Sequence, residues 1–71
     1  MFTMKAAVEL ASKALEVVAV NGPESVGDTT VLWLNADGTY SVADNGEEVD
    51  GLTAEGAKQI MIENLTAEYN N

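Results

Sequence analysis

The sequence predicts a small α+β domain, in the order α-β-β-β-α, in which two helices lie against an antiparallel three-stranded meander. Three observations indicate this fold class. Apolar residues recur at helical spacing near both ends of the 71-residue chain, whereas its middle is rich in β-branched and aromatic residues. Two segments with hairpin-turn chemistry, residues 35–38 and 45–46, divide that middle part into strands. The length and the 46% hydrophobic content predict a single domain, residues 1–71, with one modest core.

The first element is an amphipathic helix, predicted at about residues 3–19. Its apolar residues form one stripe with the i, i+4, i+7 rhythm: Met4, Val8, Ala11, Leu15 and Val18, with Ala7 and Ala14 beside them. On the polar side, Glu9 and Lys13 are four residues apart in the order that stabilises a helix. Asn21, Gly22 and Pro23 end the helix, because proline cannot continue it and glycine accepts the left-handed conformation. The alanines of the stripe permit close approach of a packing partner.

The middle of the chain is predicted as a loop followed by two hairpins. Residues 24–28 form the loop, and residues 29–34, with the sequence TTVLWL, form the first strand. The sequence NADG at residues 35–38 favours a type I turn with its glycine in the left-handed conformation. A second strand around Tyr40 and Val42 follows. Asn45-Gly46 is the strongest two-residue hairpin signal and leads into a short third strand at residues 47–50, which Gly51 ends.

The two turns also predict the register of the strands. With a three-residue loop at the first turn and a two-residue loop at the second, Leu34 pairs with Tyr40, and Val42 pairs with both Leu32 and Val49. One face of the sheet then carries Leu32, Leu34, Tyr40, Val42 and Val49. The other face carries Val31, Trp33, Ser41, Ala43, Glu48 and Asp50. We expect the first face to lie on the core, because a slip of one residue would bury the carboxylates.

The second helix is predicted at about residues 54–67. Thr53 is a good N-cap, and Glu55 in the first turn interacts favourably with the helix dipole. The residues expected to form its buried stripe are Ala57, Ile60, Met61 and Leu65. Both helices are expected on one face of the meander, and the tail at residues 69–71 is expected to be loose.

The charge of the chain is strongly one-sided. Twelve acidic residues face three basic ones, which gives a net charge of −9. Residues 1–20 hold two lysines and two glutamates and sum to zero, so the excess lies entirely in residues 21–71. Such a surface repels nucleic acid and anionic membranes and attracts proteins whose own sites are basic. We therefore expect no direct binding of nucleic acid and no association with membranes.

The residue types present also argue against catalysis and cofactors. The chain has no histidine or cysteine and no serine in a nucleophile elbow, and so small a domain has little room for a pocket that raises a carboxyl pKa. The chain is therefore not expected to be an enzyme, and neither catalytic residues nor a cofactor are predicted. Asn35, Asp37 and Asp44 partly match a calcium loop, but Trp33 would occupy its first ligand position, so no metal site is predicted. Charges interrupt the N-terminal apolar stretch, and a complete, cytoplasmic protein is expected.

Five carboxylates within twelve residues are the candidate binding residues: Asp44, Glu47, Glu48, Asp50 and Glu55. Glu48 and Asp50 project from one face of a strand, about 6.6–6.8 Å apart. Trp33 is expected on that same face, where a large aromatic side chain among acids makes an interface anchor. Two alternatives stay open: that the acids serve only solubility, and that a helix or a second copy of the chain covers Trp33.

In its size, charge and architecture, with an anionic hairpin face and no catalytic residues, the chain resembles small acidic phage-encoded inhibitors, among them anti-CRISPR proteins and DNA mimics. The resemblance implies that Glu47, Glu48, Asp50, Glu55 and Asp44 stand in for the phosphates of nucleic acid. The implied partner is a basic nucleic-acid-binding protein, such as a CRISPR effector complex, in the host cytoplasm. The alternative is a non-enzymatic assembly module or adaptor that forms a homodimer through the alanine-rich first helix or the Trp33 face.

Overall fold

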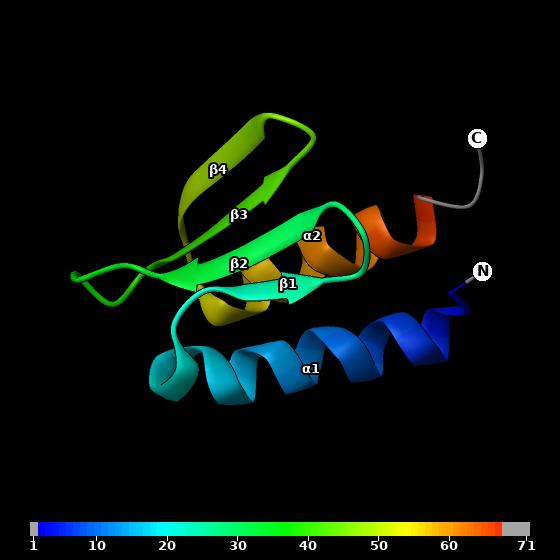
Figure 1. The fold of residues 1–71 in the computed structure, drawn as a ribbon, viewed down its shortest axis with the longest axis horizontal. Coiled ribbons are helices and arrows are strands. Elements are labelled where there is room, and N and C mark those ends of the chain that lie inside the picture. Colours follow the sequence, from blue (N-terminus) through cyan, green and yellow to red (C-terminus); the bar gives the residue numbers. More distant parts are fainter. Residues whose placement is uncertain (1, 68–71) are drawn as a thin grey trace.

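The computed structural model describes residues 2–67, so the tail predicted to be loose at residues 69–71 lies outside the described residues. The fold has two layers, a four-stranded antiparallel sheet and two helices on one of its faces (Figure 1). The elements are α1 (Met4–Asn21), β1 (Glu24–Val26), β2 (Thr30–Leu34), β3 (Tyr40–Asp44), β4 (Glu47–Leu52) and α2 (Ala54–Ala67). The strands lie side by side in chain order, β1-β2-β3-β4. The predicted α+β class is confirmed, with four strands in place of three.

Threonines cap the N-termini of both helices. The Thr3 hydroxyl accepts a hydrogen bond from the Ala6 N–H at 3.1 Å, and the Thr53 hydroxyl accepts one from the Gly56 N–H at 3.0 Å. Each cap satisfies a backbone donor that has no partner within its helix. Helix α1 ends where Gly22, with a φ of 83°, donates its N–H to the Val18 carbonyl at 3.0 Å. The bounds of α2 coincide with the prediction, whereas α1 runs two residues beyond its predicted end.

The core lies between the two helices and the inner face of the sheet. Its fully buried large side chains include Leu32 and Val42 of the sheet and Met61 and Leu65 of α2. The alanines of α1 are buried as well: Ala7, Ala11 and Ala14. Their small size lets α1 approach α2 and the sheet closely, so the alanine-rich stripe is used within the domain. It is therefore not available as a dimer surface.

Four residues predicted in the buried stripes are not fully buried: Met4, Val8, Leu15 and Ile60. Met4, in the first turn of α1, is 62% exposed, so the buried stripe begins with Ala7, one turn later than predicted. Ile60 of α2 is half-buried and packs against the edge of the core. Helical spacing predicts the direction of a side chain, but it does not predict how far the opposite layer extends.

The predicted register between the strands is confirmed. Leu34 is paired with Tyr40, and Val42 is paired with Leu32 on one side and Val49 on the other. The first turn closes with hydrogen bonds from the Asn35 N–H to the Thr39 carbonyl at 2.8 Å and from the Gly38 N–H to the Asn35 carbonyl at 3.0 Å. In the second turn, φ is 50° at Asn45 and 86° at Gly46, as a type I′ turn requires.

The prediction of a loop at residues 24–28 was wrong for its first half. Glu24–Val26 forms the edge strand β1, which pairs with β2 so that Val26 lies opposite Thr30. Only Val26 of these three residues is fully buried, so a three-residue strand leaves almost no alternating pattern in the sequence. The turn that joins it to β2 places Gly27 at a φ of 71°.

The prediction that Gly51 ends the last strand was also wrong. Strand β4 continues to Leu52, which pairs with Tyr40, and the register shifts between this pair and the Val42–Val49 pair. On β4, Asp50 and Gly51 together lie opposite the single residue Ser41, which makes a β-bulge. In a regular strand, residues three apart lie on opposite faces. Because of the bulge, Leu52 lies on the same inner face as Val49. Gly51 permits it because its φ is 70°.

Within the described residues, neither helix is long and apolar enough to cross a membrane.

Candidate protein-binding face

Within residues 2–67 the outer face of the sheet carries no helix, because α1 and α2 both lie on the inner face (Figure 1). We call this surface the open face. The register assigns to it Ser25, Val31, Trp33, Ser41, Ala43, Glu48 and Asp50. Trp33 is half-buried in the centre of this group, between the half-buried Val31 and the buried Ser41. No helix of the described chain covers Trp33, so part of its indole surface remains accessible to a partner.

A chain of hydrogen bonds fixes the floor of the open face beside Trp33. The Asn35 side-chain amide donates to the Ser41 hydroxyl at 2.9 Å, and that hydroxyl donates to a carboxylate oxygen of Asp50 at 2.7 Å. The same Asn35 amide lies 3.2 Å from the Thr39 hydroxyl. Ser41 is fully buried, so its two hydrogen bonds satisfy a polar group that would otherwise be costly to bury. The bulge of β4 brings Asp50 opposite Ser41 and so completes this chain.

The carboxyl groups of Glu48 and Asp50 form a coupled pair at the rim of the open face. The hydrogen bond from Ser41 and the shared hydrogen bond with Glu48 lower the pKa of Asp50. A hydrogen bond to Asp50 and repulsion by its charge raise the pKa of Glu48 above 4.5. Asp50 therefore ionises first, and Glu48 retains its proton to a higher pH. When both groups are ionised, two like charges lie side by side with no lysine on the same strand.

The structure divides the six predicted site residues between three places. Trp33, Glu48 and Asp50 lie together on the open face. Asp44 and Glu47 are cross-strand partners near the Asn45-Gly46 turn, on the inner face. Glu55 lies in the first turn of α2, beyond the opposite end of β4. Residues 47 and 48 lie on opposite faces because successive side chains of a strand alternate between its two faces.

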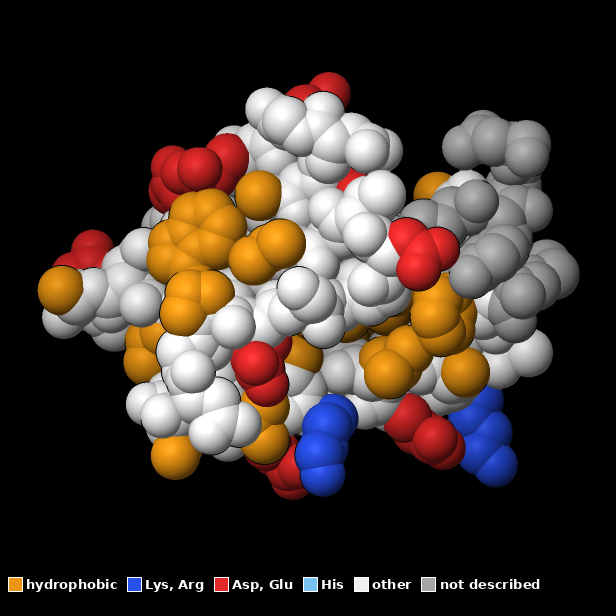
Figure 2. Space-filling model, in the orientation of Figure 1, with side chains coloured by type: hydrophobic (Ala, Val, Ile, Leu, Met, Phe, Trp, Pro, Cys, Tyr) orange, Lys and Arg blue, Asp and Glu red, His pale blue; other side chains and the backbone are white. Residues whose placement is uncertain are grey.

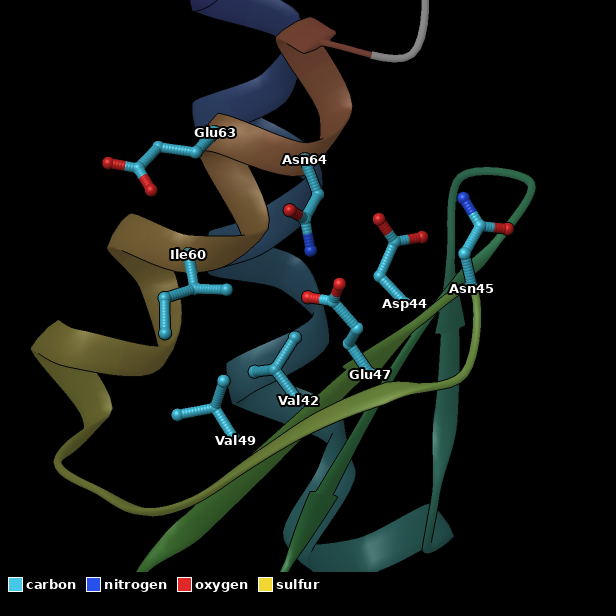
Figure 3. A pocket seen from close by; sticks show the side chains of 8 residues that line it. All are labelled: Val42, Asp44, Asn45, Glu47, Val49, Ile60, Glu63 and Asn64. Atoms are coloured by element: carbon cyan, nitrogen blue, oxygen red, sulfur yellow. The ribbon is translucent and has the colours of Figure 1, made fainter.

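Asp44 and Glu47 line a separate hollow of about 380 Å³ between the β3–β4 hairpin and α2 (Figure 3). We call this hollow the hairpin cleft. Its lining residues are Val42, Asp44, Asn45, Glu47, Val49, Ile60, Glu63 and Asn64. Asp44 also accepts a hydrogen bond from the Thr29 hydroxyl. The sequence did not indicate this hollow, because its walls come from segments that are distant in the chain.

Ser41 and Asn35 are further residues of the site that the sequence pattern did not single out. Their contribution is to position Asp50 rather than to present a charge. The predicted register already placed Ser41 opposite Trp33, on the same face as Ala43. This position was the one sequence signal that Ser41 belongs to the open face. No such signal exists for Asn35, because turn chemistry alone accounts for an asparagine there.

The surface charge follows the division seen in the sequence. Figure 2 shows hydrophobic side chains gathered over the strands at the left of the visible face, with acidic side chains beside them, and lysines along the lower edge over α1. Among residues 2–67, no group of three or more histidine, cysteine, aspartate or glutamate side chains is arranged to hold a metal ion. The open face carries an aromatic side chain, Trp33, on the same side of the sheet as the carboxylates of Glu48 and Asp50.

Comparison of the chain with protein-family models, with curated proteins and with solved structures found no match.

Proposed function

We propose that the chain is an acidic, non-enzymatic inhibitor that binds a basic nucleic-acid-binding site on another protein through its open face. The single observation that carries this proposal is the position of Trp33, which no helix of the described chain covers, beside the paired carboxylates of Glu48 and Asp50. Tryptophan is enriched among the residues that dominate the binding energy of protein interfaces, and polar residues form the rim around such a centre. The partner class follows from the net charge of −9, which a basic surface complements.

In this proposal the carboxylates of Glu48 and Asp50 take the place of nucleic-acid phosphates. A channel that holds nucleic acid, such as the channel of a CRISPR effector complex, presents lysine and arginine side chains to successive phosphates. Ser41 holds Asp50 in place, so this carboxylate loses little freedom on binding. Asp44, Glu47 and Glu55 act at a distance in this scheme, through the overall negative field, rather than at the contact.

The test is competition between the chain and nucleic acid for one captured partner. The immobilised chain is loaded with the heparin-binding fraction of a bacterial lysate and eluted with a salt gradient or with an oligonucleotide. We expect the retained protein to elute at moderate salt and to be displaced by the oligonucleotide. Replacing both carboxylates (E48Q with D50N) should weaken binding by about tenfold or more.

The matched control changes the net charge equally at a distant place. Glu9 and Glu16 are on α1, away from the open face, so E9Q with E16Q also removes two negative charges. This variant should retain most of the affinity. Equal weakening by both double variants would show that only the total charge matters, and retention that neither salt nor oligonucleotide disturbs would refute the proposal.

The accessibility of Trp33 favours one second candidate, a homodimer or small adaptor that joins open faces. Two copies would bring equal charges of −9 together, which opposes association unless apolar contact outweighs it. Loss of negative charge should strengthen a homodimer rather than weaken it, and W33A should dissociate it. Sedimentation that shows a monomer at high concentration and high salt would exclude this candidate.

A further inference from the structure

The helix layer covers β4 less than it covers the other strands. Leu32, Val42 and Val49 lie in one cross-strand row on the inner face, yet their exposed fractions are 0%, 2% and 43%. Helix α1 lies over β1 and β2, and α2 lies over β3 and β2 more than over β4. Leu52 at the end of β4 packs against the core, whereas Val49 is an exposed apolar side chain on the inner face of the strand.

Val49 belongs to the apolar part of the hairpin cleft. Val42, Val49 and Ile60 form its apolar lining, and the cleft measures about 380 Å³. Figure 3 shows Asp44 and Glu47 reaching from the hairpin toward Asn64 on α2, whereas Glu63 points away from the others. The cleft thus has an apolar end beside Val49 and a carboxylate end beside the turn.

The charge of the cleft decides what can occupy it. No lysine lies among the lining residues, so the carboxylates of Asp44 and Glu47 have no cation within the cleft itself. A long side chain with an apolar stem and a cationic head matches both ends of such a cleft. A second copy of this chain is a poor occupant, because it would bring a further charge of −9 to two carboxylates.

We propose that the hairpin cleft receives a lysine or arginine side chain from a basic segment of the partner. The methylene stem packs on Val49 and Ile60, and the cationic head binds Asp44 and Glu47. Strand β4 then forms the wall between two contacts, with the cleft on its inner side and the pair Glu48 and Asp50 on its outer side. This inference deepens the proposed function and rests on it only for the basic character of the partner.

The test uses a small probe, Nα-acetyl-lysine methylamide, titrated into the ¹⁵N-labelled chain and followed by NMR. We expect shifts that saturate and that concentrate at residues 42–49 and 60–64. Replacing both cleft carboxylates (D44N with E47Q) should lower the affinity by about three- to tenfold, as expected for two partly exposed ion pairs. V49S should lower the affinity as well, because it removes the apolar wall.

Two controls separate the cleft from a general attraction of cations. The variant E48Q with D50N removes two charges from the same strand on its opposite face and should leave the affinity for the probe within about twofold. The norleucine analogue of the probe has a similar stem and no charge, and it should bind at least severalfold more weakly. Equal losses in the two double variants, or shifts spread over the whole acidic surface, would overturn the inference.

The outcomes also distinguish this inference from the proposed function. If the probe does not bind the cleft but E48Q with D50N still releases the captured partner, the cleft inference alone is wrong. If the probe binds as expected but the captured partner is indifferent to the open face, the proposed function fails and the cation-binding cleft remains.

Discussion

Val42 on β3 and Val49 on β4 are direct cross-strand partners, yet 2% of the first side chain and 43% of the second is exposed. The two residues have the same chemistry and point to the same face, so the difference comes from the layer above them. Within residues 2–67, the two helices cover β2 and β3 more than β4, and residues 47–51 of β4 remain exposed. The covered strands hold the fully buried side chains of the sheet, whereas β4 presents exposed side chains on both of its faces.

The largest expected effect tests this division of the sheet directly. Leu32→Ala removes a fully buried side chain and should lower the free energy of unfolding by about 2–5 kcal/mol. Val49→Ala, on β4, should lower it by less than about 1 kcal/mol. Urea denaturation of both variants measures the difference. Similar losses of unfolding free energy in the two variants would mean that another molecule covers β4 in solution.

The next effect concerns the bulge that separates the two halves of β4. Gly51→Ala meets no atom within 4 Å but must adopt a φ of 70°, so it should cost about 1–2 kcal/mol. Gly46→Ala, at a φ of 86° and equally open, is the matched control with a similar backbone cost. Only the change at Gly51 should disturb the hydrogen bond from Ser41 to Asp50 and raise the pKa of Asp50. NMR titration of the Asp50 carboxyl distinguishes the two variants.

The smallest effect is the pH dependence of the Glu48–Asp50 pair. The folded pKa of Glu48 is raised above 4.5, so its ionisation disfavours the folded state, and stability is lost as the pH rises from 4.5 through the raised pKa. Glu48→Gln should therefore be more stable than the parent at neutral pH and equal to it well below pH 4.5. The pKa of Asp50 is lowered from 3.8, so its contribution is present above pH 3.8 and is lost as the pH falls through its folded pKa. Asp50→Asn loses this contribution but also removes the repulsion that raises the pKa of Glu48, so at neutral pH it should stabilise the chain less than Glu48→Gln.

Thermal unfolding of both variants between about pH 3 and pH 7 measures this difference. Greater stabilisation by Asp50→Asn than by Glu48→Gln at neutral pH would contradict the assignment of the proton to Glu48.

Much of the fold was predictable from local chemistry. The glycines at 38 and 46 identified both hairpin turns, and from the loop lengths the alternating pattern gave the pairing of Val42 with Leu32 and Val49. The position of Trp33 on the face opposite Leu32 followed from the same register. These features depend on neighbours in the chain, which is the information a single sequence carries best.

The features that were missed depend on contacts between distant segments or on very short elements. Strand β1 has three residues, and the bulge at Gly51 could be recognised only from the spacing of three between Val49 and Leu52. The division of the acidic residues between two faces was implicit in the register, but the hairpin cleft was not. Its walls, the β3–β4 hairpin and Asn64 of α2, meet only through tertiary packing.

The order of the strands has a further consequence, for the kinetics of folding. Every strand pairs with its neighbour in the chain, so each pairing closes only a short loop, whereas the contact between α1 and α2 joins the two ends of the domain. Loops of greater length cost more entropy to close, so we expect the helices to gain their mutual contact after the meander has formed. Under this order, a substitution between the helices, as at Ala11, accelerates unfolding more than it slows folding. We then expect the contact between the helices to determine the unfolding rate, and with it the lifetime of the native state.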